Sequence, residues 1–390
     1  MTGATLASGA QGAGRYKSAF AAGSESSADA WGTVTAGCLS ALGELPPRAN
    51  LGFVYATAAL ADDLGSIVTF LRERTGIADW IGTVGLGVMA PGEEFYEGPA
   101  LSVLVAALPE GSFRSFAPVA SDLAAFGRDH GGWVADHKPI LGVVHGDPRN
   151  PAIAEIIEAV SEATSAFLVG GLTASETPAF PQVCGSLGEG GLSGVLFSSE
   201  QLAVAGLSQG CTPIGEAHEI TDVMGQGIVK SLDGRPALAV LREEVGELLA
   251  RDLRRIGGYI YVALPIPGSD TGDYLVRNLV GMDLERDWLQ VGAELAPGDR
   301  VVFCRRDHAS AREDLKRMLE DLRERAGGVP RAALYFSCVA RGRHLFGPKS
   351  EELQLIRETF GDIPLTGFFA NGEISNNRLY GYTGVLTLLL

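Results

Sequence analysis

Three segments of the 390-residue chain share one pattern, and this repetition constrains the fold more than any other feature. Each segment has an apolar strand, an amphipathic helix, a second strand that runs into a glycine-rich loop, and a third strand. The first strands are LGFVY, ILGVVHG and ALYFSC, which begin at residues 51, 140 and 333. Near-continuous apolar strands are typical of sheets covered by helices. We therefore predict an α/β protein built from repeated strand–helix–strand–strand units.

The remaining elements of each unit follow from the spacing of apolar residues. Apolar side chains recur every three or four residues in the three predicted helices, and so fall on one face of each. Asn150 and Pro151 suit the N-cap and first position of the second helix. The predicted helices are 62–74, 151–164 and 350–360, the second strands are 80–87, 166–175 and 364–374, and the third strands are 100–108, 192–199 and 382–390.

A different stretch separates the second unit from the third. Residues 209–236 are punctuated by glycine and proline, which predicts a domain connector. We expect two halves, 1–215 and 216–390, each with mixed β-sheets covered by helices, and a short leader at 1–29. The elements predicted after the connector are a helix at 237–255, strands at 259–266, 273–283, 288–295 and 300–306, and a helix at 309–325.

Composition excludes several classes of function. The net charge is −16, which argues against binding to nucleic acid or to an anionic membrane surface. No apolar run reaches the roughly 18 residues that span a bilayer. The N-terminus lacks the basic and apolar regions of a signal peptide. We therefore expect a cytoplasmic protein without membrane insertion.

The five cysteines are widely spaced and odd in number, and none forms a C-x-x-C pair. This pattern predicts reduced thiols, with neither a disulfide framework nor a metal site.

Candidate ligand contacts lie where the third unit's strands end. Cys338 ends an apolar strand, and α/β proteins bind ligands at the carboxyl ends of strands. Arg341 and Arg343 follow closely, so either could lower the pKa of the thiol or hold a carboxylate. The structural alternative is a buried cysteine beside an arginine in an internal ion pair.

The loop GFFANGEISNN supplies further candidates, namely Gly367, Asn371, Gly372 and Glu373. Asn371 suits a left-handed turn or a bond to a ligand amide. Glu373 could accept the amino group of an amino-acid ligand whose carboxylate contacts Arg341. The alternative is turn chemistry, in which the glycines meet special backbone angles and Glu373 bonds a neighbouring backbone group.

A third polar group interrupts the apolar segment DYLVRNLVG. Alternation places Asp273 and Arg277 on one side of this strand and Asn278 on the other. These side chains could face a pocket, or could form an ordinary ion pair at a sheet edge.

Several motifs in order resemble the FIST domain family. The segments from TGIADWIGTVGLG to ALSVLVAALP, with FLVGGLTAS, SQGCTPIG and LDGRPAL, are similar to its N-terminal half. The segment from FSCVARGRH to GFFANGEI and YTGVLTL is similar to its C-terminal half, with the signatures SC-x-x-RG and GF-x-x-x-GEI. The likeness covers about residues 30–390, and it divides the chain into FIST N at 30–215 and FIST C at 216–390.

This resemblance implies a sensory domain that binds a small ligand in signal transduction. Amino acids or similar metabolites are the ligands that it suggests. Output would run through a separate partner, such as a histidine kinase or another signalling protein. One branch of the family is a haem-binding nitric-oxide sensor that regulates a histidine kinase, and another recruits proteins, so both functions remain as alternatives.

The haem alternative would need a histidine ligand and an apolar pocket. Without a C-x-x-C-H motif the haem would be of the b type, with His145, His218 or His344 as candidate ligands. No other cofactor is predicted. An enzyme is disfavoured, because no G-x-S-x-G elbow is present and no base for Cys338 can be identified.

Overall fold

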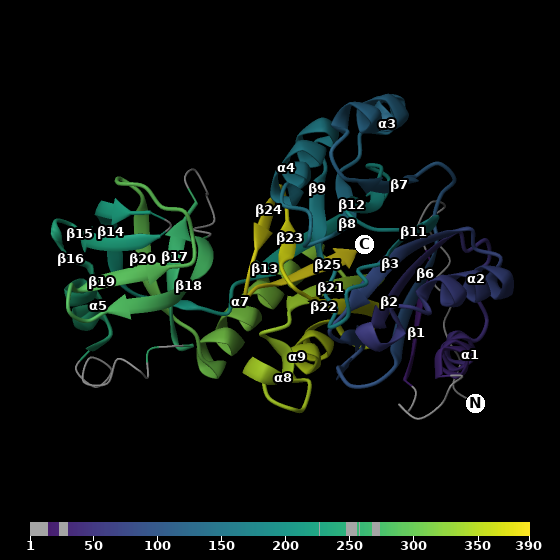
Figure 1. Ribbon diagram of the computed structural model, residues 1–390. Helices are drawn as coiled ribbons and strands as arrows, with labels where there is room; N and C mark the ends of the chain where they lie inside the picture. The colour runs from purple at the N-terminus through teal and green to yellow at the C-terminus, as the bar shows by residue number, and fades with distance from the viewer. Residues whose placement is uncertain (1–14, 23–29, 226, 247–255, 257, 267–273) are drawn as a thin grey trace.

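The computed structural model describes residues 15–22, 30–225, 227–246, 256, 258–266 and 274–390. It is an α/β fold with mixed sheets, as predicted. Three related units form one body, and a β-barrel inserted in the third unit lies to one side of it (Figure 1).

The three units repeat the same order of elements. Unit 1 comprises β1 (Arg15–Ala22), α1 (Ala30–Leu42), β2 (Leu51–Thr57), η1 (Ala58–Leu60), α2 (Leu64–Thr75), β3 (Asp79–Gly85), β4 (Val88–Ala90), β5 (Glu93–Phe95) and β6 (Ala100–Ala107). Unit 2 comprises β7 (Phe113–Val119), α3 (Leu123–His137), β8 (Leu141–Gly146), α4 (Ile153–Thr164), β9 (Phe167–Leu172), β10 (Gln182–Cys184), β11 (Ser186–Gly188) and β12 (Leu192–Phe197). Unit 3 comprises β13 (Ala203–Ser208), α7 (His308–Ala326), β21 (Ala332–Cys338), α8 (Gly342–Leu345), α9 (Glu351–Phe360), β22 (Leu365–Ala370), β23 (Glu373–Ser375), β24 (Arg378–Tyr380) and β25 (Gly384–Leu389).

The strands of each unit pair in the same way. The first strand is parallel to the second and antiparallel to the last, as in the sets β2–β3–β6, β8–β9–β12 and β21–β22–β25. An extra strand, β1, β7 or β13, borders the last strand of each set. The three predicted repeats are therefore confirmed as three structural units.

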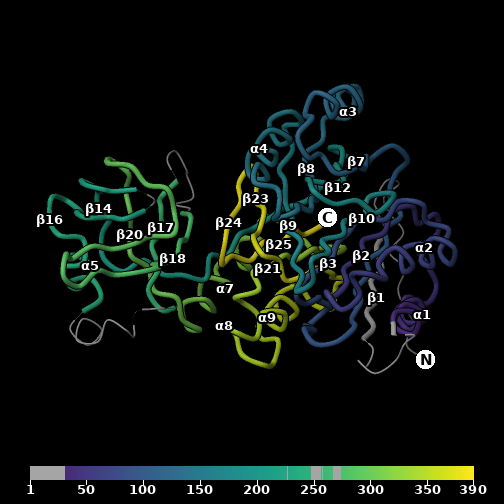
Figure 2. The backbone as a smooth tube through the Cα atoms, in the orientation of Figure 1, coloured from purple at the N-terminus to yellow at the C-terminus, as the bar shows by residue number. Residues whose placement is uncertain are grey.

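Each unit also lends a hairpin to another unit. The hairpin β4–β5 of unit 1 pairs with β22 of unit 3, β23–β24 of unit 3 pairs with β9 of unit 2, and β10–β11 of unit 2 pairs with β3 of unit 1. The exchange is cyclic, so no unit completes its own sheet. Segments distant in sequence thus lie side by side, as the backbone trace shows (Figure 2).

Equivalent side chains of the three first strands meet in the core. Tyr55, His145 and Phe336 are the fifth residues of β2, β8 and β21, and all three are buried. The Tyr55 ring lies 5.4 Å from the His145 ring and 5.9 Å from the Phe336 ring. The Tyr55 hydroxyl and His145 Nε2 are 3.1 Å apart. The first strands of all three units therefore meet at this contact.

The predicted connector at 209–236 is wrong, because most of its described residues lie in strands of the barrel. The inserted segment comprises β14 (Thr212–Met224), β15 (Ile228–Leu232), β16 (Arg235–Pro236), α5 (Ala237–Glu244), β17 (Ile260–Pro265), β18 (Tyr274–Asp283), β19 (Trp288–Val291) and β20 (Arg300–Arg305). The long strand β14 pairs with β20 at one end and β15 at the other, which closes the sheet. Gly215, with φ of 72°, bends this strand rather than ending it.

The third unit does not follow the predicted boundary between residues 215 and 216. Its edge strand β13 precedes that boundary but pairs with β25 at the end of the chain. The barrel leaves the unit after β13 and returns at α7. The helix predicted at 237–255 is described as Ala237–Glu244, and residues 247–255 lie outside the described part.

The helices of the three repeats lie within two residues of their predicted bounds. The second, α4, begins at Ile153 rather than at Pro151. The reason is local, because Asn150 Oδ1 accepts a hydrogen bond from Ala152 N and so forms a turn before the helix. No helix in the described ranges is long and apolar enough to cross a membrane.

One glycine in each second strand permits the close approach of the first strand. A Cβ on Gly82, Gly170 or Gly367 would lie 1.7, 1.8 or 1.7 Å from the carbonyl oxygen of Val54, Val144 or Tyr335, respectively. Backbone atoms cannot give way as a flexible side chain can. Gly367, expected to contact ligand, is therefore required by strand packing.

We expect Gly367→Ala to destabilise the protein by more than about 3 kcal/mol, because the new Cβ clashes with a backbone carbonyl in the core. Urea unfolding measures the free energy. The matched control is Gly381→Ala, where no atom lies within 4 Å of an added Cβ. Equal stabilities of the two variants would contradict this explanation.

Candidate functional site

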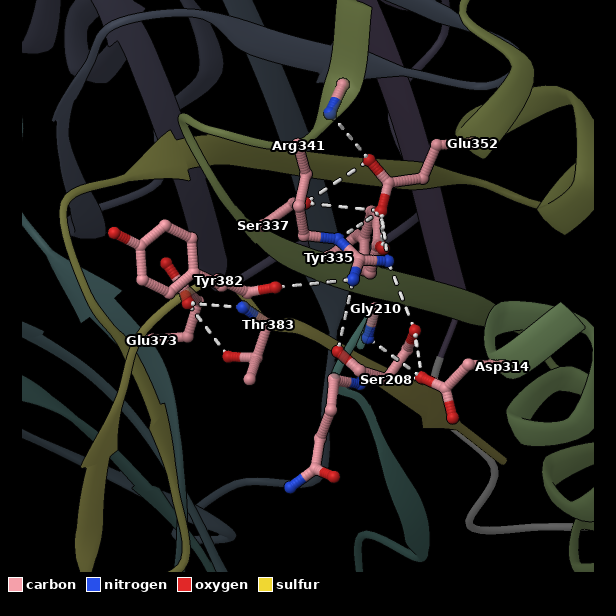
Figure 3. Close-up of polar contacts among 12 residues, drawn as sticks. Ser208, Gly210, Asp314, Tyr335, Ser337, Arg341, Glu352, Glu373, Tyr382 and Thr383 are labelled. Carbon is pink, nitrogen blue, oxygen red and sulfur yellow. Dashed lines mark hydrogen bonds and ion pairs between the residues drawn. The ribbon is translucent and has the colours of Figure 1, made fainter. Parts of the chain in front are cut away.

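The guanidinium of Arg341 lies inside the protein in an ion pair (Figure 3). Its side chain is fully buried, and Nε and Nη2 lie 2.8 and 2.7 Å from Glu352 Oε1. Nη1 donates to the Ser208 carbonyl at 3.2 Å. Arg341 was expected to hold a ligand carboxylate, but here a carboxylate of α9 occupies that position.

The Glu352 carboxylate also binds other polar groups of the motif SC-x-x-RG and of the strand before it. It accepts hydrogen bonds from the Tyr335 hydroxyl, from Ser337 Oγ at 3.2 Å and from Gly342 N at 3.1 Å. The Ser, Arg and Gly of SC-x-x-RG therefore all contact one buried acid. This network joins β21 to α8 and α9, and its polar groups compensate each other where water is absent.

The same network reaches the point where the chain leaves for the barrel. Arg341 Nη2 lies 3.1 Å from Ser208 Oγ, which donates at 2.9 Å to Asp314 of α7. Asp314 also accepts from the backbone nitrogens of Gln209 and Gly210, at 2.7 and 3.0 Å. One chain of polar contacts therefore connects α8 and α9 to the root of the barrel.

Cys338 is a buried thiol, and its pKa is raised to about 12 by burial and by the nearby Glu373 carboxylate. The prediction that the neighbouring arginines lower this pKa is wrong. The arginine that lowers the pKa of Cys338 is Arg306, whose effect burial outweighs, and the guanidinium of Arg341 is paired with Glu352. Cys338 is therefore protonated at neutral pH and is not an activated nucleophile.

Glu373 is also fully buried. Its Oε2 accepts from Thr383 N at 3.0 Å and from Thr383 Oγ1 at 2.8 Å, whereas Oε1 has no hydrogen-bond partner among the described residues. Burial raises its pKa to about 8. Gly372 accepts from Leu172 N at 2.8 Å across the hairpin exchange, and Asn371 is exposed beside it. Glu373 thus binds the segment before β25, and Gly372 binds β9 of unit 2.

The predicted polar stripe of β18 lies partly at the interface between the barrel and unit 3. Asn278 Oδ1 accepts a hydrogen bond of 2.7 Å from the Tyr382 hydroxyl. Arg277 is partly buried, and it donates to the Val276 carbonyl at 2.9 Å. Asp273, the third predicted residue, lies outside the described residues.

A pocket of about 710 Å³ lies beyond the carboxyl end of β2, where loops of all three units meet. Its size is that of a small-molecule site. Unit 1 contributes most of the wall, unit 2 contributes residues 176–177, and unit 3 contributes Val339 after β21 together with Arg343 and His344 of α8. The ionisable groups that line it are Asp63, Tyr96, Glu97, Glu176, Arg343 and His344.

Arg343 is the positive group of this pocket. Its guanidinium carbon lies 4.5 Å from the centre of the Tyr96 ring, which in turn stacks on Phe369 at 4.5 Å. Nη1 lies 2.9 Å from Glu97 Oε1. The stack on the Tyr96 ring orients the guanidinium. The Glu97 side chain, by contrast, is 80% exposed to solvent.

Comparisons with known proteins match both parts of the chain to one family. The FIST N domain matches residues 50–235, and the FIST C domain matches residues 237–376. The chain belongs to the FIST family. The family consists of small-ligand-binding sensory domains of signal transduction.

Two mycobacterial relatives extend this comparison. An uncharacterized protein of Mycobacterium tuberculosis is 32% identical over 374 residues, which cover 90% of this FIST protein and 96% of the relative. An uncharacterized protein of Mycobacterium bovis is 36% identical over 195 residues, which cover 47% and 50% of the two chains.

The three candidate haem ligands lie in separate places. His145 is fully buried in the aromatic core, and burial lowers its pKa to about 3. Both ring nitrogens of His218 contact carboxylates, those of Asp233 and Glu244. His344 lines the pocket, but the walls there carry three carboxylates and an arginine. A b-type haem requires apolar walls, so these surroundings do not fit it.

Sequence reasoning missed most of the pocket. It singled out Arg343 and His344 beside Cys338, yet assigned the ligand to Arg341. Tyr96 and Glu97 lie within a segment that resembles the family and Glu176 directly follows another, but none of the three was predicted to contact ligand. One signal was available in the sequence, because Gly342 precedes Arg343 and glycine favours a turn after a strand; the structure gives Gly342 a φ of 42°.

We expect Arg341→Met to lower the free energy of unfolding by about 3–5 kcal/mol, because it leaves Glu352 buried without its cation. The double variant Arg341→Met/Glu352→Gln should recover part of this loss, since the neutral amide needs no counter-charge. Urea denaturation of the single and double variants measures the coupling. Strictly additive losses would show that the ion pair does not hold the network together.

The raised pKa of Glu373 predicts a pH-dependent stability. The pKa of Glu373 is about 8 in the folded protein, against an ordinary value of 4.5 for an unfolded chain. The protonated acid therefore favours the folded state. This contribution to the free energy of unfolding is complete below pH 4.5 and is lost as the pH rises through about 8. Glu373→Gln stays neutral, and it should exceed the wild type in stability by at least about 1 kcal/mol above pH 8.

Unfolding by urea at several pH values between 5 and 9 tests this prediction, with exposed Glu324→Gln as the control. The control and the wild type should show the same dependence of the free energy of unfolding on pH. A Glu373→Gln profile parallel to theirs would mean that Glu373 is ionised throughout.

Proposed function

We propose that this FIST protein is a cytosolic sensor that binds an amino-acid-like metabolite in the three-unit pocket and signals through a separate partner protein. The observation that carries the proposal is the Arg343 guanidinium, held on the Tyr96 ring at the pocket wall beside an exposed counter-ion. The family relationship supports the small-ligand role.

Arg343 suits the recognition of a carboxylate. Its planar guanidinium can donate two parallel hydrogen bonds to a carboxylate, and the stack on Tyr96 keeps it in one orientation. Glu97 is its ion-pair partner in the described structure. An exposed pair of this kind contributes little free energy, about 0–1 kcal/mol. A ligand carboxylate can therefore replace Glu97 at small cost.

The negative groups of the same pocket suit a ligand ammonium. Asp63 precedes α2, but its side chain does not cap that helix, so the carboxylate is available to the pocket. Glu176 adds a second carboxylate from unit 2. A zwitterion would thus contact positive charge on unit 3 and negative charge on units 1 and 2.

Such a ligand would bridge the units, which supplies a way to signal. Arg343 follows Arg341 and Gly342 directly, and these two residues bond Glu352 and the Ser208 carbonyl at the barrel root. A ligand that favours one position of α8 therefore biases the barrel's attachment as well. The change would be a shift between existing arrangements, one of which binds the partner more tightly.

The test is a thermal-shift screen of the purified protein against the proteinogenic amino acids. A binder should raise the melting temperature, and the Arg343→Gln variant should lose at least tenfold in affinity by calorimetry. Arg128→Gln is the matched control, because Arg128 is an exposed arginine of α3 outside the pocket.

Decarboxylated and deaminated analogues separate the two halves of the ligand. Loss of binding on removal of the carboxylate supports the role of Arg343. Undiminished binding by Arg343→Gln would refute the pocket assignment. Partner binding without any amino-acid effect would instead favour a protein-recruitment module.

A further inference from the structure

Two buried cysteines lie in contact where the barrel joins unit 3. Cys211 directly precedes β14, and Cys304 lies in β20, where the antiparallel register places Pro213 opposite Cys304. Cys211 is therefore the diagonal neighbour of Cys304 on the same face of the strand pair. The two belong to one hydrophobic cluster with Tyr261, and the Cys304 thiol is hydrogen-bonded to the Cys211 sulfur.

The two thiols differ in access. Cys211 lines a groove of about 990 Å³ between the barrel and α7, next to Thr212 and Tyr274. Cys304 is fully buried behind it. Among the described residues, no other two cysteines share a cluster, since Cys38 and Cys184 lie in separate cores.

We propose that Cys211 and Cys304 form a modification site at which a small hydroperoxide generates a disulfide. Cys211, reached through the groove, attacks the terminal peroxide oxygen as a thiolate, and the O–O bond breaks. The products of this step are a sulfenic acid on Cys211 and an alcohol, or water when the oxidant is hydrogen peroxide. The Cys304 sulfur then displaces the hydroxyl group from Cys211 as water. Two thiols are oxidised, and one peroxide is reduced.

The order of these steps follows from the difference in access between the two thiols. The hydrogen bond to Cys211 and burial both hold the pKa of Cys304 well above its ordinary value. Cys211 lines the groove, so a peroxide that enters it meets this sulfur before the fully buried Cys304. Cys211 therefore reacts first and Cys304 resolves the intermediate.

The bridge would act on the attachment of the barrel. Cys211 lies on the segment that leaves unit 3 after β13, and Cys304 lies just before the segment that returns at α7. A covalent link between them would tie the two connections together. The cysteine pair does not line the pocket of Arg343, so a test of this proposal is independent of a test of the proposed function.

The test treats the full-length protein with an equimolar amount of hydrogen peroxide, blocks free thiols with N-ethylmaleimide, and maps the peptides by mass spectrometry. The expected result is a protein lighter by two hydrogen atoms, with a linked peptide pair that contains Cys211 and Cys304. A dithiol reductant should cleave this link and restore both thiols. A protein that stays fully reduced, or a bridge between another pair, would overturn the proposal.

Variants separate the two roles. Cys304→Ala should accumulate a sulfenic acid on Cys211 that dimedone labels, and Cys211→Ala should yield neither label nor bridge. Cys184→Ala, the matched control, should form the bridge as the wild type does. Circular dichroism checks that each variant is folded. Dimedone labelling that is unchanged in Cys211→Ala would assign the reaction to another thiol.

Discussion

The exchange of hairpins between the three units is the constraint on which the rest of the structure depends. Each β-hairpin satisfies its backbone hydrogen bonds on a strand of another unit, so a unit that separated would expose unpaired strand edges. The exchange also fixes where the loops end. It brings residues of all three units to one pocket beyond β2, and it places Tyr55, His145 and Phe336 together in the core.

The inserted barrel is joined to unit 3 by two segments of chain, and buried polar contacts position the first of them. Arg341, paired with Glu352, binds the carbonyl of Ser208 in this segment, and Asp314 accepts a hydrogen bond from the next backbone nitrogen. A buried ion pair is costly unless every polar group is satisfied. Here donors from β21 and α8 bind Glu352, and acceptors of Ser208 in β13 bind Arg341, so the same contacts that stabilise unit 3 also position the barrel.

Sequence patterns predicted the repeats well, because the strands and helices of each unit carry a clear local periodicity of apolar residues. They failed at 209–236, where glycines were interpreted as breaks between domains. Gly215 instead bends a continuous barrel strand, and only the partners on both sides of β14 reveal this. Arg341 was misinterpreted for a related reason, because an arginine after a strand looks the same whether its carboxylate belongs to a ligand or to α9.

The sequence by itself determined the α/β class, the three units, their helices and the membership of the FIST family, because these properties reside in apolar spacing and contiguous motifs. The tertiary structure alone decided which residues share a site. Arg343, Glu97 and Glu176 meet only because the exchanged hairpins bring three units to one point, and Cys211 meets Cys304 only because β14 pairs with β20. Contacts between distant segments depend on strand register, which local periodicity does not encode.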